Sequence, residues 1–121
     1  MMDSSDKAIL IVNDENDIAD LFADALETQG FKTAVTDNPS LALGKINDNP
    51  DDYSLVLIDR NSQQDLNFPK QVKTINDKIK VLLSSGFAFI DVETSKSGYD
   101  KVIQLPVTIS ELLARVRDVL S

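Results

Sequence analysis

The sequence predicts an α/β fold, a doubly wound five-stranded parallel sheet with helices on both faces, in a single domain over residues 1–121. Short unbroken apolar runs rich in branched side chains are typical of strands buried on both faces of a parallel sheet. Apolar residues recur with the helical period between these runs. Strand–helix alternation at this spacing implies parallel strands joined by right-handed crossovers. The length suits one hydrophobic core.

Five segments are predicted as strands, and two of them end abruptly in carboxylates. The predicted strands are 8–12, 31–36 with Val35 at its centre, 54–59, 81–83 and 102–103. The run 55–58 is wholly apolar and stops at Asp59, and the first run stops at residues 13–15. Open α/β sheets place ligands at the carboxyl ends of their strands, so Asp59 is the first candidate functional residue.

The first two helices have clear start or stop signals. One helix follows residue 15 and stops at Gly30, since glycine commonly follows a last helical turn. Its apolar stripe is predicted to be Ile18, Leu21, Phe22, Ala25 and Leu26. The next helix begins at 37–39, where a side-chain cap and a proline in the first turn are available. Leu43 and Ile46 are predicted on its buried side.

The second half of the chain contains three further predicted helices. A short one begins near Phe68-Pro69 and carries Val72 and Ile75. Segment 87–98 lacks a clean stripe and has β-branched and small polar residues, so a short or poorly ordered helix is expected there. In the last helix, Thr108 and Glu111 have the spacing of a capping box. Its stripe is predicted to be Ile109, Leu112, Leu113, Val116 and Leu120.

Composition narrows the possible functions. The chain has no cysteine and no histidine, which excludes disulfides, thiolate metal sites and imidazole catalysis. A net charge of −8 disfavours direct nucleic-acid binding and favours a cation or a basic patch on a protein partner. No apolar run approaches the ~20 residues of a membrane span, and residues 1–6 lack the features of a signal peptide. A cytoplasmic protein is expected.

Polar residues at three strand ends form a candidate site. These are Asn13-Asp14-Glu15, Asp59 and Ser85, which converge if the first, third and fourth strands are neighbours. Carboxylates at close range repel one another and raise each other's pKa unless a cation lies between them. Oxygen ligands without histidine or cysteine favour Mg²⁺, Mn²⁺ or Ca²⁺. A bound ion would keep Asp59 ionised and could hold a phosphoryl group against it.

These motifs resemble the receiver domains of two-component response regulators over nearly the whole chain. Segment 9–15 is similar to the family's first strand and acidic pair, and 55–59 to its phosphoacceptor strand. Segment 81–86 is similar to the strand that ends in the switch Ser/Thr, and 110–116 to the last helix. The resemblance implies a flavodoxin-like (βα)5 fold.

The resemblance also implies roles for individual residues. Asp59 would accept the phosphoryl group, and Ser85 would donate a hydrogen bond to a phosphoryl oxygen. Asp14, Asp59 and the backbone carbonyl of Asn61 would ligate Mg²⁺ or Mn²⁺, with Asn13 contributing weakly or through water. A histidine kinase or phosphotransfer protein would supply the phosphoryl group, and an unidentified downstream protein would receive the signal.

The chain departs from the family pattern at several positions. The first acidic position is Asn13, and the Met-Pro and Gly that usually follow the phosphoacceptor are absent from 60–67. The switch aromatic falls on Val102, and the family's Lys-Pro pair is Leu105-Pro106. Leucine supplies neither a charge nor a donor, so slow or low-occupancy modification of Asp59 is expected. Whether the Leu105-Pro106 peptide is cis stays open.

Three classes of function remain. The preferred one is a stand-alone receiver, not an enzyme, phosphorylated on Asp59 in Mg²⁺-dependent phosphorelay signalling, with output through protein–protein contact. The alternative is a degenerate receiver that acts as a phosphorylation-independent binding module. A hydrolase of the haloacid dehalogenase type is a weaker third class, because Asn61 stands where that family has a second carboxylate. The kinase, the target and the oligomeric state stay open.

Overall fold

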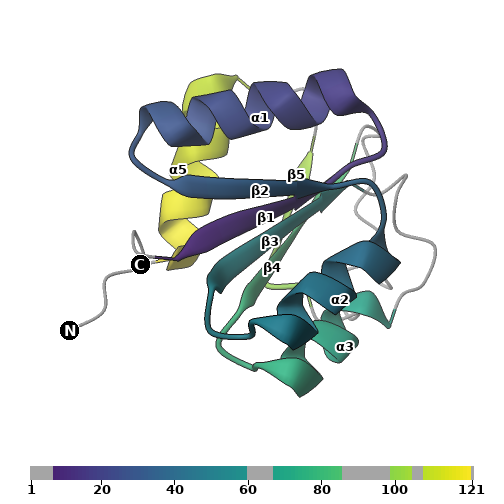
Figure 1. Cartoon of the computed structure of the whole chain (residues 1–121). Helices are drawn as coiled ribbons and strands as arrows, with labels where there is room; N and C mark the ends of the chain where they lie inside the picture. Colours follow the sequence, from purple (N-terminus) through teal and green to yellow (C-terminus); the bar gives the residue numbers. More distant parts are fainter. Residues whose placement is uncertain (1–6, 60–66, 86–98, 105–107, 121) are drawn as a thin grey trace.

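The computed structural model describes residues 7–59, 67–85, 99–104 and 108–120. Their strands form one parallel sheet in the order β2-β1-β3-β4-β5 (Figure 1). The strands are β1 (Ala8–Val12), β2 (Lys32–Thr36), β3 (Tyr53–Asp59), β4 (Lys80–Ser85) and β5 (Lys101–Gln104). The strand order reverses direction at β1, as in doubly wound folds, so the predicted α/β parallel sheet is confirmed.

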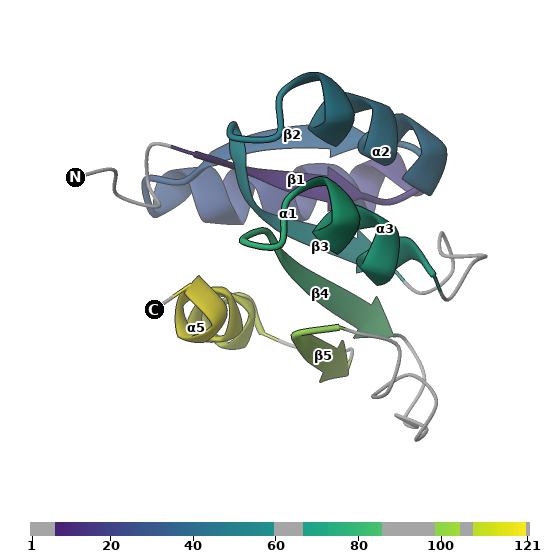
Figure 2. The same ribbon diagram turned by 90° about the horizontal axis from the view of Figure 1, so that it is seen from below.

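Helices cover both faces of the sheet. The described helices are α1 (Asn16–Thr28), α2 (Pro39–Asp48), α3 (Phe68–Ile75) and α5 (Ile109–Leu120). α1 and α5 pack on one face, whereas α2 and α3 pack on the other (Figures 1 and 2). The helix predicted within 87–98 falls outside the described residues. Among the described helices, none has both the length and the apolar character needed to cross a membrane.

β3 lies at the centre of the molecule and contributes to both apolar cores. Successive strand residues point to opposite faces. Leu55 and Leu57 therefore pack with α1 and α5, and Val56 and Ile58 pack with α2 and α3. All four side chains are buried, and burying each one fully contributes about 1.5–3 kcal/mol. The prediction that this strand is buried on both faces is confirmed.

The predicted helix boundaries are confirmed by their caps. The Asn38 side chain accepts a hydrogen bond from the Leu41 backbone N–H (2.9 Å), and Pro39 follows it as the first residue of α2. At α5, the Glu111 N–H donates to Thr108 Oγ1 (3.1 Å), while the Thr108 N–H donates to Glu111 Oε1 (3.4 Å). Gly30 follows α1 with a φ of +93°, a conformation that glycine adopts at little cost.

The predicted apolar stripes are only partly correct. Leu21 is 54% exposed, and the buried residues of α1 are Ala19, Phe22, Ala23 and Leu26. The buried stripe is rotated from the predicted one, so that Ala19 and Ala23 lie on the buried side and Leu21 lies on the opposite side. In α5, Leu112, Leu113 and Val116 are buried as predicted, whereas Ile109 in the first turn is exposed. Leu43 of α2 is half-buried, and Ala42 takes the central position beside Ile46.

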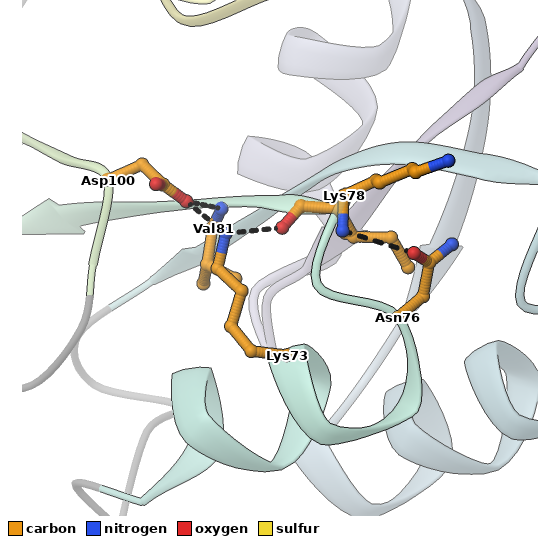
Figure 3. Close-up of polar contacts among 6 residues, drawn as sticks. Lys73, Asn76, Lys78, Val81 and Asp100 are labelled. Carbon is orange, nitrogen blue, oxygen red and sulfur yellow. Dashed lines mark hydrogen bonds and ion pairs between the residues drawn. The ribbon is translucent and has the colours of Figure 1, made fainter.

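A polar cluster fixes the entry into β5 (Figure 3). Lys73, in the last turn of α3, donates from Nζ to Asp100 Oδ2 (2.8 Å) and to the Ile79 carbonyl (2.6 Å). The Val81 N–H donates to the same Asp100 oxygen (2.7 Å), and the Asp100 N–H donates back to the Val81 carbonyl (2.8 Å). These bonds hold α3, β4 and the residue before β5 together.

Candidate functional site

The strand register brings the predicted site residues to one edge of the sheet. β3 lies between β1 and β4, as the sequence-based convergence requires. Val12 pairs with Ile58, so Asn13, the next residue, lies level with Asp59. Asp59 in turn pairs with Ser84 on β4. The carboxyl ends of three neighbouring strands therefore carry an amide, a carboxylate and a hydroxyl side by side.

Asn13 has a structural role as well as a place at the site. Its side chain is only 3% exposed, and its Oδ1 accepts the Glu15 N–H at 2.8 Å. Its backbone N–H donates to the Thr36 carbonyl at 3.1 Å. These bonds extend the pairing of β1 by one residue and turn the chain toward α1. An amide oxygen has a second lone pair, so Oδ1 can still bind an ion or its water.

Asp14 and Asp59 differ in their surroundings. Asp59 is half-buried at the end of β3, whereas Asp14 is exposed in the short loop that leads to α1. Within the described ranges, no three acidic, histidine or cysteine side chains are grouped as a metal site would require. The donors of the candidate site are all oxygens, which fit a hard divalent ion such as Mg²⁺ with water completing its coordination.

Ser84 is a neighbour of Asp59 that sequence reasoning missed. It pairs with Asp59 and is buried, whereas Ser85 pairs one position further along with Gln104. Leu57 and Leu82 share the core beneath α1 and α5, so two-residue alternation puts Asp59 and Ser84 on that same face. Family resemblance assigned the switch hydroxyl to Ser85, and the pattern within the strand could not show that Ser84 pairs with Asp59, because that pairing depends on register.

Several predicted site positions cannot be placed with the others. The backbone of Asn61 and the Leu105-Pro106 pair lie outside the described residues, as do the side chains of Ser85 and Val102. Their assignments therefore stay predictions. The structure brings Asn13, Asp59 and Ser84 together at the carboxyl ends of β1, β3 and β4. Asp14 follows Asn13 in the loop that leads to α1.

Comparison with known proteins finds likeness in both sequence and fold. The transcriptional regulatory protein ZraR of Klebsiella oxytoca is 32% identical over 90% of this chain, and the chain spans 27% of that protein's length. A CheY-like response regulator receiver domain protein from Methanospirillum hungatei superimposes with a TM-score of 0.83 at 24% identity, over 94% of this chain and 93% of that one. No family model matches the chain.

The structure of a third similar protein contains a modified aspartic acid and two bound ligands. It is a response regulator of Burkholderia pseudomallei whose structure contains a phosphorylated aspartic acid, a calcium ion and citrate. It superimposes with a TM-score of 0.79 at 22% identity, over 96% of this chain and 67% of that one. The chain therefore has the fold of CheY-like response regulator receiver domains, and its sequence is similar to part of a transcriptional regulatory protein.

Proposed function

We propose that Asp59 accepts a phosphoryl group in Mg²⁺-dependent phosphorelay signalling. The observation that carries this proposal is the register that sets Asp59 level with Asn13 and opposite Ser84 at the carboxyl edge of the sheet. An Asp59 carboxylate oxygen forms a bond to phosphorus while the bond from phosphorus to the donor's leaving atom breaks. The leaving atom keeps the electron pair. The phosphorylated aspartic acid in the similar Burkholderia regulator supports this chemistry.

The proposed ion site uses Asp14, Asp59 and the backbone carbonyl of Asn61. Asn13 adds an amide oxygen, directly or through water, because its Oδ1 also accepts the Glu15 N–H. Mg²⁺ or Mn²⁺ bound there neutralises part of the negative charge that phosphorylation adds. With one carboxylate fewer than the family pattern, this site binds the ion more weakly.

The proposed partners follow from the receiver assignment. A histidine kinase or phosphotransfer protein supplies the phosphoryl group in the cytoplasm, and Ser85 donates a hydrogen bond to a phosphoryl oxygen afterwards. A single domain over residues 1–121 passes the signal on through contact with a downstream protein. The net charge of −8 disfavours direct contact with nucleic acid.

Leu105 sets the expected efficiency of the reaction. A lysine at this position would form a charge-assisted hydrogen bond with the phosphoryl group. Such bonds contribute about 1.5–3 kcal/mol, which corresponds to roughly tenfold to a hundredfold in a rate or equilibrium. Modification of Asp59 is therefore slow or incomplete in the natural chain, and Leu105→Lys raises it.

The test is mass spectrometry of the intact protein after treatment with acetyl phosphate and Mg²⁺. Wild type should gain a labile phosphoryl group at low occupancy, Leu105→Lys should gain more, and Asp59→Asn should gain none. Omitting Mg²⁺ should abolish the gain in both competent proteins. Equal and complete modification of wild type and Leu105→Lys would contradict the lysine argument, and modification of Asp59→Asn would contradict the choice of phosphoacceptor.

A second candidate is a degenerate receiver that binds its partner without a phosphorylation cycle. The missing charge at Asn13 favours it, because an amide stands where the family usually has a carboxylate. The same experiment separates the two functions. If neither wild type nor Leu105→Lys is modified at any Mg²⁺ concentration, the binding-module function is the correct one.

A further inference from the structure

The edge strand β2 offers an unpaired backbone. β2 is the terminal strand of the sheet, so within the described residues only β1 pairs with it. Edge strands are templates for pairing with another chain unless charges, proline or a covering element protect them. This one carries a single charge, Lys32 at its start, and the apolar side chain of Val35 is 36% exposed.

A hollow of about 430 Å³ lies between this edge and α2. Val35 and Leu41 are among the residues that line it, and the apolar side chain of Leu41 is 53% exposed. Three charged residues also line it: the carboxylates of Asp37 and Asp48, and the ammonium of Lys45. With two carboxylates against one ammonium, the hollow has an excess of one negative charge. A long apolar stem with one positive end would complement such a site.

We propose that two copies of this chain associate through antiparallel pairing of their β2 strands. A two-fold axis through Ala34 lets all five residues of the strand pair, with Lys32 opposite Thr36 and Thr33 opposite Val35. Ala34 packs against the core beneath α2 and α3, so two-residue alternation puts Lys32 on that same face. Residues opposite each other in an antiparallel pair share a face.

This geometry carries Lys32 of the second copy toward the hollow. Its methylene stem lies along Leu41, and its ammonium approaches Asp37 and Asp48, which neutralises the excess charge. Symmetry repeats the contact, so each hollow receives one lysine. The strand starts with a basic residue and is followed by an acidic one, Asp37, so antiparallel self-pairing joins unlike charges. The interface is small, and the dimer is expected to be weak and concentration-dependent.

The first test is sedimentation equilibrium of the unphosphorylated full chain at concentrations up to about 1 mM. It compares wild type with two single charge-reversal variants and with the double variant that exchanges both charges. Cross-strand charge pairs are modest individually but occur twice here, so Lys32→Glu and Asp37→Lys should each weaken dimerisation roughly tenfold. The double variant, Lys32→Glu with Asp37→Lys, should restore it. Lys78→Glu and Asp77→Lys make the same charge changes at exposed positions before β4 and should have no effect.

Amide hydrogen exchange of the wild-type protein at low and high concentration gives a test that needs no variant. Amides of β2 should gain protection at high concentration, and amides of the already paired β3 should not. A monomer at every concentration, or a dimer with unchanged protection of β2, would overturn the proposal. A double variant that is folded by circular dichroism yet remains as weak as the single variants would overturn it as well.

Discussion

Asn13 stabilises a turn of the backbone and also lies in the candidate site, level with Asp59. Its Oδ1 accepts the Glu15 N–H at 2.8 Å and so supports the turn between β1 and α1. An aspartate would keep this acceptor and add a negative charge at the row of strand ends. The natural amide carries no charge, so at the proposed ion site it should attract a cation less than an aspartate would.

Asn13→Asp is therefore expected to bind Mg²⁺ roughly tenfold more tightly, a difference of about 1.4 kcal/mol. The measurement is a titration followed by amide shifts of residues 13–15 and 59 in NMR spectra. Asn47→Asp, an exposed change near the end of α2, adds the same charge elsewhere and serves as the control. Equal affinities of wild type and Asn13→Asp would show that this position does not contribute to ion binding.

Tyr53 gives the protein a pH-dependent stability. Burial raises the pKa of its phenol above the ordinary value of 10.0, and the nearby Asp52 carboxylate raises this pKa further. The folded state therefore holds this proton more tightly than the unfolded chain. Its contribution to stability is fully present below pH 10.0 and is lost as the pH rises through the folded-state pKa.

The free energy of unfolding should accordingly fall more steeply above pH 10 in wild type than in Tyr53→Phe, which has no phenol to ionise. Urea unfolding at several pH values between about 8 and 11 measures this difference. Between about pH 8 and 9 the offset between the two proteins should be constant. Parallel pH profiles across the whole range would contradict the prediction.

At the scale of single elements, the start of α5 is fixed by hydrogen bonds in its first turn. The reciprocal bonds of Thr108 and Glu111 fix where the helix begins, and the Arg117 Nη2 donates to Gln29 Oε1 just after α1. Leu112, Leu113 and Val116 then face the core that α5 shares with α1. A correct start is required for these three residues to meet the sheet together.

Thr108→Ala should therefore lower the free energy of unfolding by about 0.5–2 kcal/mol, the usual cost of losing an N-terminal cap. Ser110→Ala changes an exposed hydroxyl two residues later and should be nearly neutral. Chemical denaturation of both variants measures the two effects. A Thr108→Ala protein as stable as Ser110→Ala would show that the capping box contributes nothing in solution.

At the scale of the whole molecule, the sheet separates two cores, and among the described residues these cores share no side chains. Ile11 packs in the core beneath α1 and α5, and Ile46 of α2 packs in the core on the opposite face. Both residues are fully buried. Truncating them leaves two separate gaps, each of which must be accommodated by its own neighbours.

Ile11→Val and Ile46→Val should each cost about 0.5–1.5 kcal/mol, and the double variant should lose their sum to within about 0.5 kcal/mol. Equilibrium unfolding in urea measures all three values. A double variant that departs from the sum by more than about 1 kcal/mol would show coupling through the sheet.

The sequence by itself determined the features that depend on short-range patterns. The apolar runs of β1 and β3, the cap at Asn38 and the capping box at Thr108 depend on neighbours only a few residues away, and all were predicted correctly. The candidate carboxylates Asp14 and Asp59 were found in the same way, because each follows an apolar run. Family resemblance then gave these residues their proposed roles.

Only the tertiary structure decided what depends on segments far apart in the chain. It set Ser84 opposite Asp59, exposed Leu21 of α1, and left β2 with Val35 at the edge of the sheet. Strand register and helix rotation are fixed when distant apolar surfaces pack against each other, and periodicity within one segment cannot specify that fit. A one-residue change in register would reverse which side chains face the site, although the sequence pattern would be the same.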